Sequence, residues 1–461
     1  VLSLDADEEL PVESHALLRR MLADEAVMGW RLPLVDIGRE SEGQSYVPRL
    51  FRNAPGRCWV GRVHEQVFYS VEVRRKEWGL GNRLGDAGLR HHGYTPEVMR
   101  ERGKVERNLR LLERAIDEIP DDPALVMNYG LELIRSDRID EGLSQYRMAF
   151  AMMSQQVPAT VVPETREALL TQYGTYLLSA RRAGEVPGLF ASPLARRSPF
   201  TASQHFVLGL ALRELQQFSE AAEQLRACLA KRGEATLTPV NSEIRKVTPR
   251  HFLALSLWQG KEPAAAEAEF RLALEEDGAA QKLAVDFARF LQEQGQVVEA
   301  LQLLNQFTSA YPTHAGPWIA GGRIALGRPE LLEVALNWTD VAVNHHPTEP
   351  AMLAQRAEAL LLAGDWAQAL PLWTELSRSS DARALAAQLV CGLASGGEIQ
   401  LPDDAAGTAI SGEFSHWYWR LVEFGTEAVV LRLHARVEVL DACLPEAAAM
   451  VHSVISNLRV A

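Results

Sequence analysis

The sequence predicts a mixed α/β segment followed by an all-α array of helical repeats, so the chain is expected to be mostly helical. Two observations carry this prediction. Short apolar or alternating runs separated by turns fill residues 1 to about 95. From about residue 121 onward the apolar spacing is helical and recurs at a fixed interval. At 461 residues the chain has room for about two to four domains.

The chain begins with an apolar run that leads into carboxylates, within residues 1–9. In a strand, Asp5 and Asp7 would point to the same side. Two such oxygen ligands suit a divalent cation that keeps open positions for a phosphate-bearing substrate. Alternatively, Asp7 or Glu8 would cap the helix that follows. No initiator Met and no upstream βα units precede this motif, so we expect the chain to be the later part of a longer protein.

The rest of the first segment predicts further helices and strands. Helical spacing indicates a helix over 12–26. Apolar, alternating or aromatic-rich runs indicate strands at 30–37, 46–51, 58–69 and 69–73. Four glycines predict a loop over 79–88, and Thr95-Pro96 predicts the start of a long charged helix over 97–118.

Beyond residue 121 the sequence repeats with a period of about 34 residues. Successive small residues lie 34, 35 and 34 positions apart, at Ala266, Ala300, Ala335 and Ala369. Bulky or packing residues follow them by four positions, at Phe270, Leu304, Thr339 and Trp373. This helix–turn–helix period resembles the tetratricopeptide repeat, in which small residues let paired helices approach closely. We expect about five to seven units over 121–380, with a degenerate unit near 165–200 and an inserted loop over 231–248.

The last 80 residues or so predict a helical cap, because terminal repeats need one. We expect a helix over 381–394, a Gly/Asp-rich connector over 396–412, and helices over 426–443 and 445–458. The aromatic run 414–419 is interpreted as packing of these helices rather than as a platform for a sugar. The expected domains are therefore 1–95, a connecting helix over 96–120, the array over 121–380, and the cap over 381–461.

Charge and cysteine content narrow the functional classes. The net charge is −13, and residues 1–119, with 19 Lys and Arg against 20 Asp and Glu, account for only −1 of it. The remainder is acidic, which argues against nucleic-acid binding through bulk electrostatics. Four cysteines far apart in the sequence fit a reducing compartment. No stretch is apolar enough for a membrane span, so a cytoplasmic protein is expected.

Four short fragments occur in order in the first segment, at 4–8, 49–52, 62–65 and 91–94. They contain, in turn, an Asp-x-Asp motif, an Arg-Leu-Phe-Arg run, a Val-His-Glu run and a His-His-Gly-Tyr run. A helix rich in Lys, Arg and Asn follows. The set resembles family 2 glycosyltransferases of the GT-A fold, in the bacterial subgroup that fuses the catalytic domain to tetratricopeptide repeats. The resemblance covers about residues 1–115 and implies that residues 1–95 are the later part of a GT-A domain.

The resemblance implies roles for several residues. In this family the Asp-x-Asp motif holds Mn²⁺ or Mg²⁺, which bridges the diphosphate of a nucleotide-sugar donor. Asp7 would be a direct ligand, and Asp5 would face the ribose or the metal. His91 would complete the metal shell or touch the diphosphate, and Arg49 or Arg52 would stabilise phosphate oxygens.

An inverting transfer also needs a base that deprotonates the acceptor, and Glu65 matches that position. Each assignment has a simpler alternative. Glu65 would otherwise pair with Arg62 on a surface strand, His91 and His92 would lie in a turn, and the two arginines would lie on a solvated strand face.

Two functions follow. The first is a metal-dependent, inverting glycosyltransferase that uses a nucleotide-sugar, with a repeat array that binds the acceptor peptide, protein or glycan, or a partner protein. Because the nucleotide-binding first half of the domain is absent, we expect this fragment to be inactive by itself. The alternative is a non-enzymatic tetratricopeptide-repeat scaffold for protein interaction with a remnant transferase head. In either case the stacked helices would build a long groove for a partner.

Overall fold

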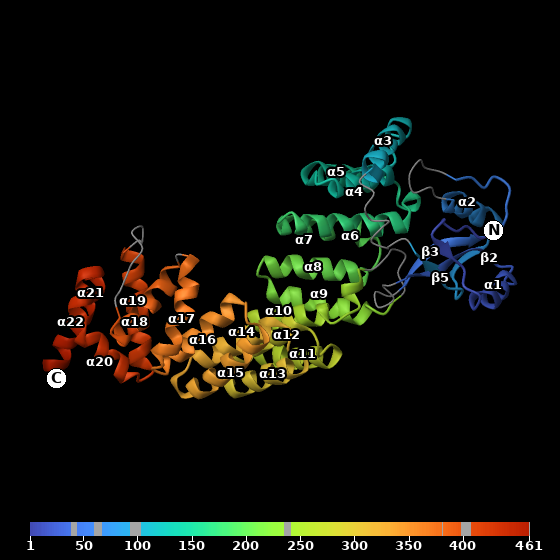
Figure 1. Cartoon of the computed structure of the whole chain (residues 1–461). Helices are drawn as coiled ribbons and strands as arrows, with labels where there is room; N and C mark the ends of the chain where they lie inside the picture. The colour runs from blue at the N-terminus through green and yellow to red at the C-terminus, as the bar shows by residue number, and fades with distance from the viewer. Residues whose placement is uncertain are drawn as a thin grey trace. The chain divides into compact units, whose positions relative to one another are not determined.

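A computed structural model describes residues 1–37, 44–59, 67–92, 103–234, 241–379, 381–397 and 407–460. The chain divides into two compact units, Val1–Glu276 and Asp277–Ala461. Figure 1 shows a small sheet near the N-terminus and helices in all that follows. Each unit is described by itself below.

The sheet belongs to the first unit and is built around β2 (Val27–Asp36). This strand pairs antiparallel with β3 (Gln44–Phe51) and parallel with β4 (Gly81–Leu84) and β5 (Leu89–His91). The short β1 (Glu8–Glu9) pairs antiparallel with β5. The strand order is β1-β5-β2-β3, with β4 beside the first half of β2.

Side chains of β2 are buried on both faces of the sheet. Val27, Trp30 and Leu32 join one apolar cluster, against which partly buried residues of α1 (Ser14–Leu22) pack. Met28 joins a second cluster, which includes Val71 of α2 (Phe68–Trp78). A strand covered on both faces is expected to be a nearly continuous apolar run, and the run in the sequence predicted it correctly.

Several predictions for the first segment are wrong. Asp5 and Asp7 do not lie in a strand: residues 6 and 7 form a turn, and the strand begins only at Glu8. Neither Asp7 nor Glu8 caps a helix, because α1 begins after Glu13, which makes no side-chain capping bond. The physical reason is that the N-terminal segment is held along the sheet by backbone bonds, such as that from Ser3 N to Arg49 O.

The strand predicted over 69–73 is also wrong, since these residues lie in α2. Val67 and Val71, four positions apart, pack together in one cluster, which is a helical spacing. Within the predicted loop 79–88 the structure places β4, and Gly79 ends α2 in the left-handed conformation (φ 67°) that glycine adopts readily. The predicted start of the long helix at Thr95-Pro96 lies outside the described residues.

The helices of the first unit follow the sheet. They are α3 (Gly103–Glu118), α4 (Pro123–Arg135), α5 (Ile139–Gln155), α6 (Pro163–Ser179), α7 (Val186–Ala191), α8 (Ala202–Glu214), α9 (Phe218–Lys231), α10 (Thr248–Gln259) and α11 (Pro263–Glu276). Consecutive helices pack as pairs, with α4 on α5, α8 on α9 and α10 on α11. The short α7 confirms that the unit near 165–200 is degenerate.

The second unit continues the same pattern. Its helices are α12 (Gln281–Glu293), α13 (Val297–Ala310), α14 (Ala315–Leu326), α15 (Leu332–His345), α16 (Pro350–Leu362), α17 (Trp366–Leu376), α18 (Ala382–Ser395), α19 (Gly407–Glu423), α20 (Glu427–Ala435), α21 (Val437–Cys443) and α22 (Pro445–Val460). Again α12 packs on α13, α14 on α15 and α16 on α17. The helix predicted over 426–443 is two helices, α20 and α21, that meet at Arg436.

The periodic small residues lie where paired helices touch. The four alanines at 34- to 35-residue intervals are completely buried in α11, α13, α15 and α17, the second helices of their pairs. In the first unit, a Cβ at Gly142 would lie 2.7 Å from the carbonyl oxygen of Gly130, so α5 and α4 meet backbone to backbone. These positions confirm that small residues recur at the repeat period because they let paired helices approach closely.

The aromatic run near the C-terminus serves packing, as predicted. Phe414, Trp417 and Tyr418 are completely buried in α19. The Trp417 ring meets that of Trp373 edge to face at 5.3 Å between centroids. Among the described residues, no helix combines the length and apolarity that crossing a membrane requires.

Candidate functional site

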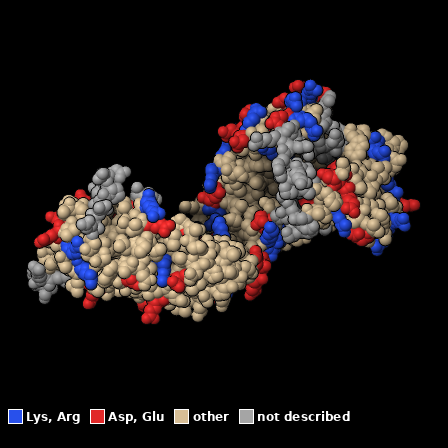
Figure 2. Space-filling model, viewed as in Figure 1, with Lys and Arg blue, Asp and Glu red and all other residues tan. Residues whose placement is uncertain are grey.

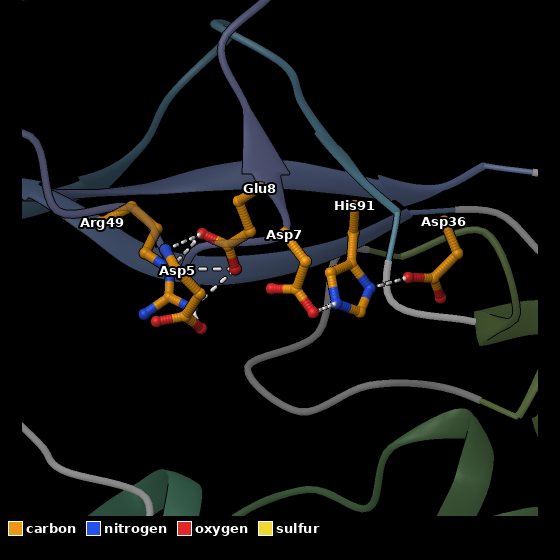
Figure 3. A network of polar contacts seen from close by, with 6 residues as sticks. All are labelled: Asp5, Asp7, Glu8, Asp36, Arg49 and His91. Carbon is orange, nitrogen blue, oxygen red and sulfur yellow. Dashed lines mark hydrogen bonds and ion pairs between the residues drawn. The ribbon is translucent and has the colours of Figure 1, made fainter. Parts of the chain in front are cut away.

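Four of the predicted site residues meet in one polar network beside the sheet. Figure 3 shows the network, which consists of Asp5, Asp7, Glu8, Asp36, Arg49 and His91. We call these six residues the head network. Glu8 and His91 come from the paired strands β1 and β5, and Arg49 comes from β3.

Arg49 is shared between two carboxylates. Its Nη2 donates to Glu8 Oε1 at 2.6 Å and to the carboxylate of Asp5, and its Nε donates to Glu8 Oε2 at 2.9 Å. The side chain of Glu8 is only 2% exposed. Burial disfavours the charged guanidinium, but the bonds and charges of Glu8 and Asp5 outweigh it and raise the pKa of Arg49. The Nε and Nη2 donors of Arg49 are therefore occupied within the chain.

His91 lies between two other carboxylates. Its Nδ1 is 2.7 Å from Asp36 Oδ1, and its Nε2 is 3.3 Å from Asp7 Oδ2. Burial disfavours the imidazolium, yet Asp36 and Asp7 outweigh burial and raise the pKa of His91. A protonated imidazole donates from both nitrogens and has no lone pair for a metal ion.

The described side chains are paired with one another: Arg49 binds the carboxylate of Asp5, and His91 lies beside that of Asp7. Within the described ranges no group of three or more His, Cys, Asp or Glu side chains is suited to hold a metal ion. Metal binding by Asp5, Asp7 and His91 therefore stays a prediction, which requires these ion pairs to open.

Two predicted site residues are not in the network. Arg52 donates to backbone carbonyl oxygens instead, from Nε to Val27 at 2.7 Å and from Nη2 to Asp24 at 2.6 Å. Its guanidinium also lies 5.9 Å from the ring centre of Trp30. Glu65, the predicted base, lies outside the described residues, as does the Gly93-Tyr94 part of the fourth fragment.

Sequence reasoning missed Glu8 and Asp36. Asp36 ends the buried run of β2 and pairs in register with His91 of the parallel strand β5. A polar residue at the carboxyl end of an apolar strand is a recognisable signal for a site, and it would have identified Asp36. Glu8 carried no such signal, because its burial depends on Arg49 from a strand 41 residues later.

A second candidate surface lies in the helices of the second unit. The first helices of successive pairs, α12, α14 and α16, pack directly on one another. A Cβ at Gly316 would lie 2.3 Å from Gln281 Nε2, and one at Gly322 would lie 2.3 Å from Gln355 Oε1. Gln355 Nε2 also donates to Ile319 O at 2.9 Å. Because glycine lets the helices approach this closely, the three form one continuous surface.

Few residues of these first helices reach solvent. On α12 the exposed positions include Lys282 and Arg289, which lie two turns apart on one stripe. On α14, Arg323 is exposed and Ile319 is half-buried. We call Gln281, Lys282, Arg289, Ile319, Arg323 and Gln355 the first-helix surface.

Charged side chains of both signs lie near one another on the face of the molecule drawn in Figure 2. On the view in Figure 2 the Lys and Arg side chains alternate with Asp and Glu, and wide areas of the second unit carry neither. Arg289 itself pairs with Asp286 at 2.9 Å. Such a surface suits contacts with a protein chain better than contacts with a polyanionic nucleic acid.

Comparison with known proteins finds one curated relative and several solved structures that are similar to parts of the chain. No family model matches the chain. A TPR repeat-containing protein of Synechococcus elongatus is 28% identical over 138 residues, which are 29% of this chain and 34% of that protein. The chain thus spans about a third of the length of this curated relative.

Several solved structures are similar at low identity. YrrB, described as a TPR protein with an unusual peptide-binding site, is 16% identical, with 53% of this chain and 96% of that chain covered and a TM-score of 0.29. PilF of Pseudomonas aeruginosa is 19% identical, with 49% and 97% covered and a TM-score of 0.35. A TPR repeat-containing protein of Cytophaga hutchinsonii is 13% identical, with 60% and 95% covered and a TM-score of 0.40.

The fold of the helical part is argued from this chain itself. Paired helices recur along both units, and the buried alanines recur at 34 to 35 residues. No comparison supports a GT-A domain in residues 1–95, and the described part of that segment contains one small five-stranded sheet. The helical part of the chain therefore has a tetratricopeptide-repeat fold, and a transferase domain before it stays a prediction.

Proposed function

We propose that this chain is a protein-interaction scaffold that binds an extended segment of a partner protein along the first-helix surface. The observation that carries the proposal is the direct packing of α12, α14 and α16 into one continuous surface. Stacked helix pairs present such surfaces over several repeats, and an extended chain can cross all of them.

The side chains on this surface suit an extended peptide. Gln355 packs from α16 against α14, where its Nε2 donates to Ile319 O at 2.9 Å. Ile319 offers apolar contact nearby, and Lys282 and Arg323 would attract acidic side chains at the edges.

The test is to select peptides from a random displayed library on the immobilised full chain. Affinities of the selected peptides are then measured by fluorescence anisotropy. Lys282→Glu combined with Arg323→Glu should weaken binding about tenfold or more, because two attractive charges become repulsive.

Arg378→Glu is the matched control, since Arg378 is exposed in the turn after α17 and away from the first helices. It should change affinity less than about twofold. If the double variant binds as tightly as the parent chain, the first-helix surface is not the binding site.

The glycosyltransferase interpretation is a second candidate, favoured by the meeting of Asp5, Asp7, Arg49 and His91 in the head network. It proposes a nucleotide-sugar donor, Mn²⁺ or Mg²⁺ as cofactor, and Glu65 as base. It is tested by measuring Mn²⁺-dependent hydrolysis of nucleotide-sugars by the protein made from its complete natural gene. Asp7→Ala should abolish that hydrolysis, and full activity in this variant would contradict the metal assignment.

A further inference from the structure

Two helices of the C-terminal cap, α19 and α20, form a hairpin at the end of the second unit (Figure 1). They pack on each other and are joined by residues 424–426 alone. Tyr418 of α19 meets His434 of α20, with 2.8 Å between the hydroxyl oxygen and Nε2 and 5.9 Å between the ring centres. Because so short a turn makes the helices antiparallel, side chains one turn closer to it than this contact also lie opposite each other.

Three apolar side chains are exposed around this contact. Val422 follows Tyr418 by four positions, and Leu431 precedes His434 by three. Both therefore lie one helical turn closer to the connecting turn, on the sides where the helices meet. The ring of Trp419 meets that of Tyr418 edge to face, with 5.4 Å between the ring centres. Trp419, Val422 and Leu431 are 51%, 43% and 64% exposed, and they form one apolar surface along the hairpin.

The exposed charges beside these three side chains are acidic. Glu423 follows Trp419 by four positions, and Glu427 precedes Leu431 by four. At this spacing each carboxylate lies on the same face of its helix, one turn closer to the connecting turn. Both glutamates are exposed, and Glu423 keeps a contact of 3.4 Å to Arg420.

The arginines of the two helices point back into the chain. Arg420 Nη2 donates to Glu358 Oε1 at 2.9 Å, and its side chain is only 16% exposed. Arg432 Nη1 donates to Ala394 O at 2.9 Å, and its guanidinium lies 4.7 Å from the ring centre of Trp366. The hairpin thus presents apolar side chains and carboxylates, while these two arginines are engaged within the chain.

This clustering distinguishes the hairpin from the helices before it. Among the described residues of α12 to α17, the exposed large apolar side chains are Val298 and Val334, which lie singly on two different helices. Single exposed apolar residues are normal, whereas a cluster with a polar rim is typical of an interaction site. Helices of this unit pack on several others, as α14 does on α12, α13, α15 and α16. A further helix laid along the hairpin would bury its apolar surface in the same way.

We propose that Trp419, Val422 and Leu431, with Glu423 and Glu427 at their edge, bind one amphipathic helix of a partner protein that carries Lys or Arg beside its apolar face. We call these five residues the hairpin surface. The apolar face of the partner helix would cover the three apolar side chains, as in other helix-in-groove complexes. Its cations would meet the two carboxylates. A second copy of this chain is a poorer match, because a two-fold contact would bring the same carboxylates together.

The hairpin surface shares no residue with the first-helix surface, and the inference does not rest on that proposal. The two fail separately. Peptides from the displayed library that lose affinity for Lys282→Glu with Arg323→Glu should bind Leu431→Gln as tightly as they bind the parent chain.

The experiment uses the full chain and a fluorescein-labelled peptide of eighteen Leu and Lys residues, with Leu at helical spacing. One companion peptide has the same composition in strict alternation, which cannot gather Leu on one face of a helix. Another keeps the helical spacing and replaces Lys with Glu. Binding is followed by fluorescence anisotropy at physiological salt. Both companions should bind about tenfold more weakly than the helical Leu/Lys peptide, or weaker still.

Leu431→Gln should weaken binding of the helical Leu/Lys peptide about tenfold or more, because it removes an apolar contact at the centre of the surface. Val298→Gln is the matched control, since Val298 is 66% exposed on α13, and it should change affinity less than about twofold. Trp419→Gln gives a second test, with a loss similar to that of Leu431→Gln.

Glu427→Gln should weaken binding about threefold and reduce its dependence on salt. Its control is Glu446→Gln, because Glu446 is also exposed in the first turn of a helix of the cap, α22. This control should leave both the affinity and the salt dependence unchanged.

Three results would overturn the proposal. The first is equal weakening by Leu431→Gln and Val298→Gln, or no binding of the helical Leu/Lys peptide. The second is equal binding of either companion peptide. The third is a dimer of the parent chain, seen by sedimentation, that Leu431→Gln dissociates, because the surface would then bind a second copy. Circular dichroism of each variant confirms that it is folded.

Discussion

The head network and the arginine pair of the degenerate repeat, Arg166 of α6 and Arg197 of the 3₁₀ helix Ala195–Arg197, have opposite charge balance. In the head network four carboxylates surround Arg49 and His91, and each of these two residues has two acidic partners. Around Arg166 and Arg197, cations outnumber the carboxylates that act on them, and one buried nitrogen has no acceptor. The first cluster is satisfied within the chain, and the second still lacks a partner.

The difference teaches where to look for a ligand. A side chain that looks catalytic in the sequence can be paired within the chain, as Asp5 is paired with Arg49. A buried donor can lack an acceptor where no sequence motif marks it, as Arg197 Nη1 does. Unsatisfied donors are the more informative signal, because native proteins rarely bury them without a reason.

The largest expected effect comes from Arg49→Gln. Glu8 is almost fully buried, so removing its cation leaves a buried carboxylate without compensation, which costs about 3 kcal/mol. Hydrogen exchange of the backbone amides of β1 and β3 measures the loss. Arg83→Gln is the control, because Arg83 pairs with Asp24 in an exposed position and should cost no more than about 1 kcal/mol. Equal protection in the two variants would show that the head network does not stabilise the sheet.

A smaller effect is expected from the protonation of His91. Its pKa is raised in the folded state, so protonation stabilises the sheet below the pKa of the unfolded chain. This stabilisation is lost as the pH rises through the higher folded pKa. Hydrogen exchange of β5, corrected for intrinsic rates, should therefore show less protection above that pKa than below it.

His91→Gln should remove this dependence and cost about 1 kcal/mol at low pH, the value of one hydrogen bond. His92→Gln is the control, since His92 is half exposed and pairs only with Glu9 at 3.1 Å. A pH dependence that survives in His91→Gln would assign the titration to another group.

The array was predictable from sequence because its contacts are local. Ala300 and Ala335 recur at the repeat period, and each is completely buried in a helix that packs on the helix just before it in the chain. The strand of β2 was predictable for a similar reason, as burial on both faces leaves an unbroken apolar run.

The head network could be predicted only in part. The four fragments singled out Asp5, Asp7, Arg49 and His91, and the structure does bring them together. Their pairing depends on contacts between residues 41 or more positions apart, which no local pattern encodes. Arg166 and Arg197 escaped notice altogether, because an unsatisfied nitrogen is visible only once the neighbouring groups are placed.

The smallest expected effect concerns Arg197, in the arginine pair of the degenerate repeat. Arg197→Gln should leave stability unchanged or raise it by up to about 1 kcal/mol, because it removes a buried donor without an acceptor and relieves the repulsion of Arg166. Urea unfolding of the full chain, followed by the exchange of α6 amides, measures the change. A loss of stability would mean that Arg197 is already satisfied within the chain, and the two clusters would then be alike.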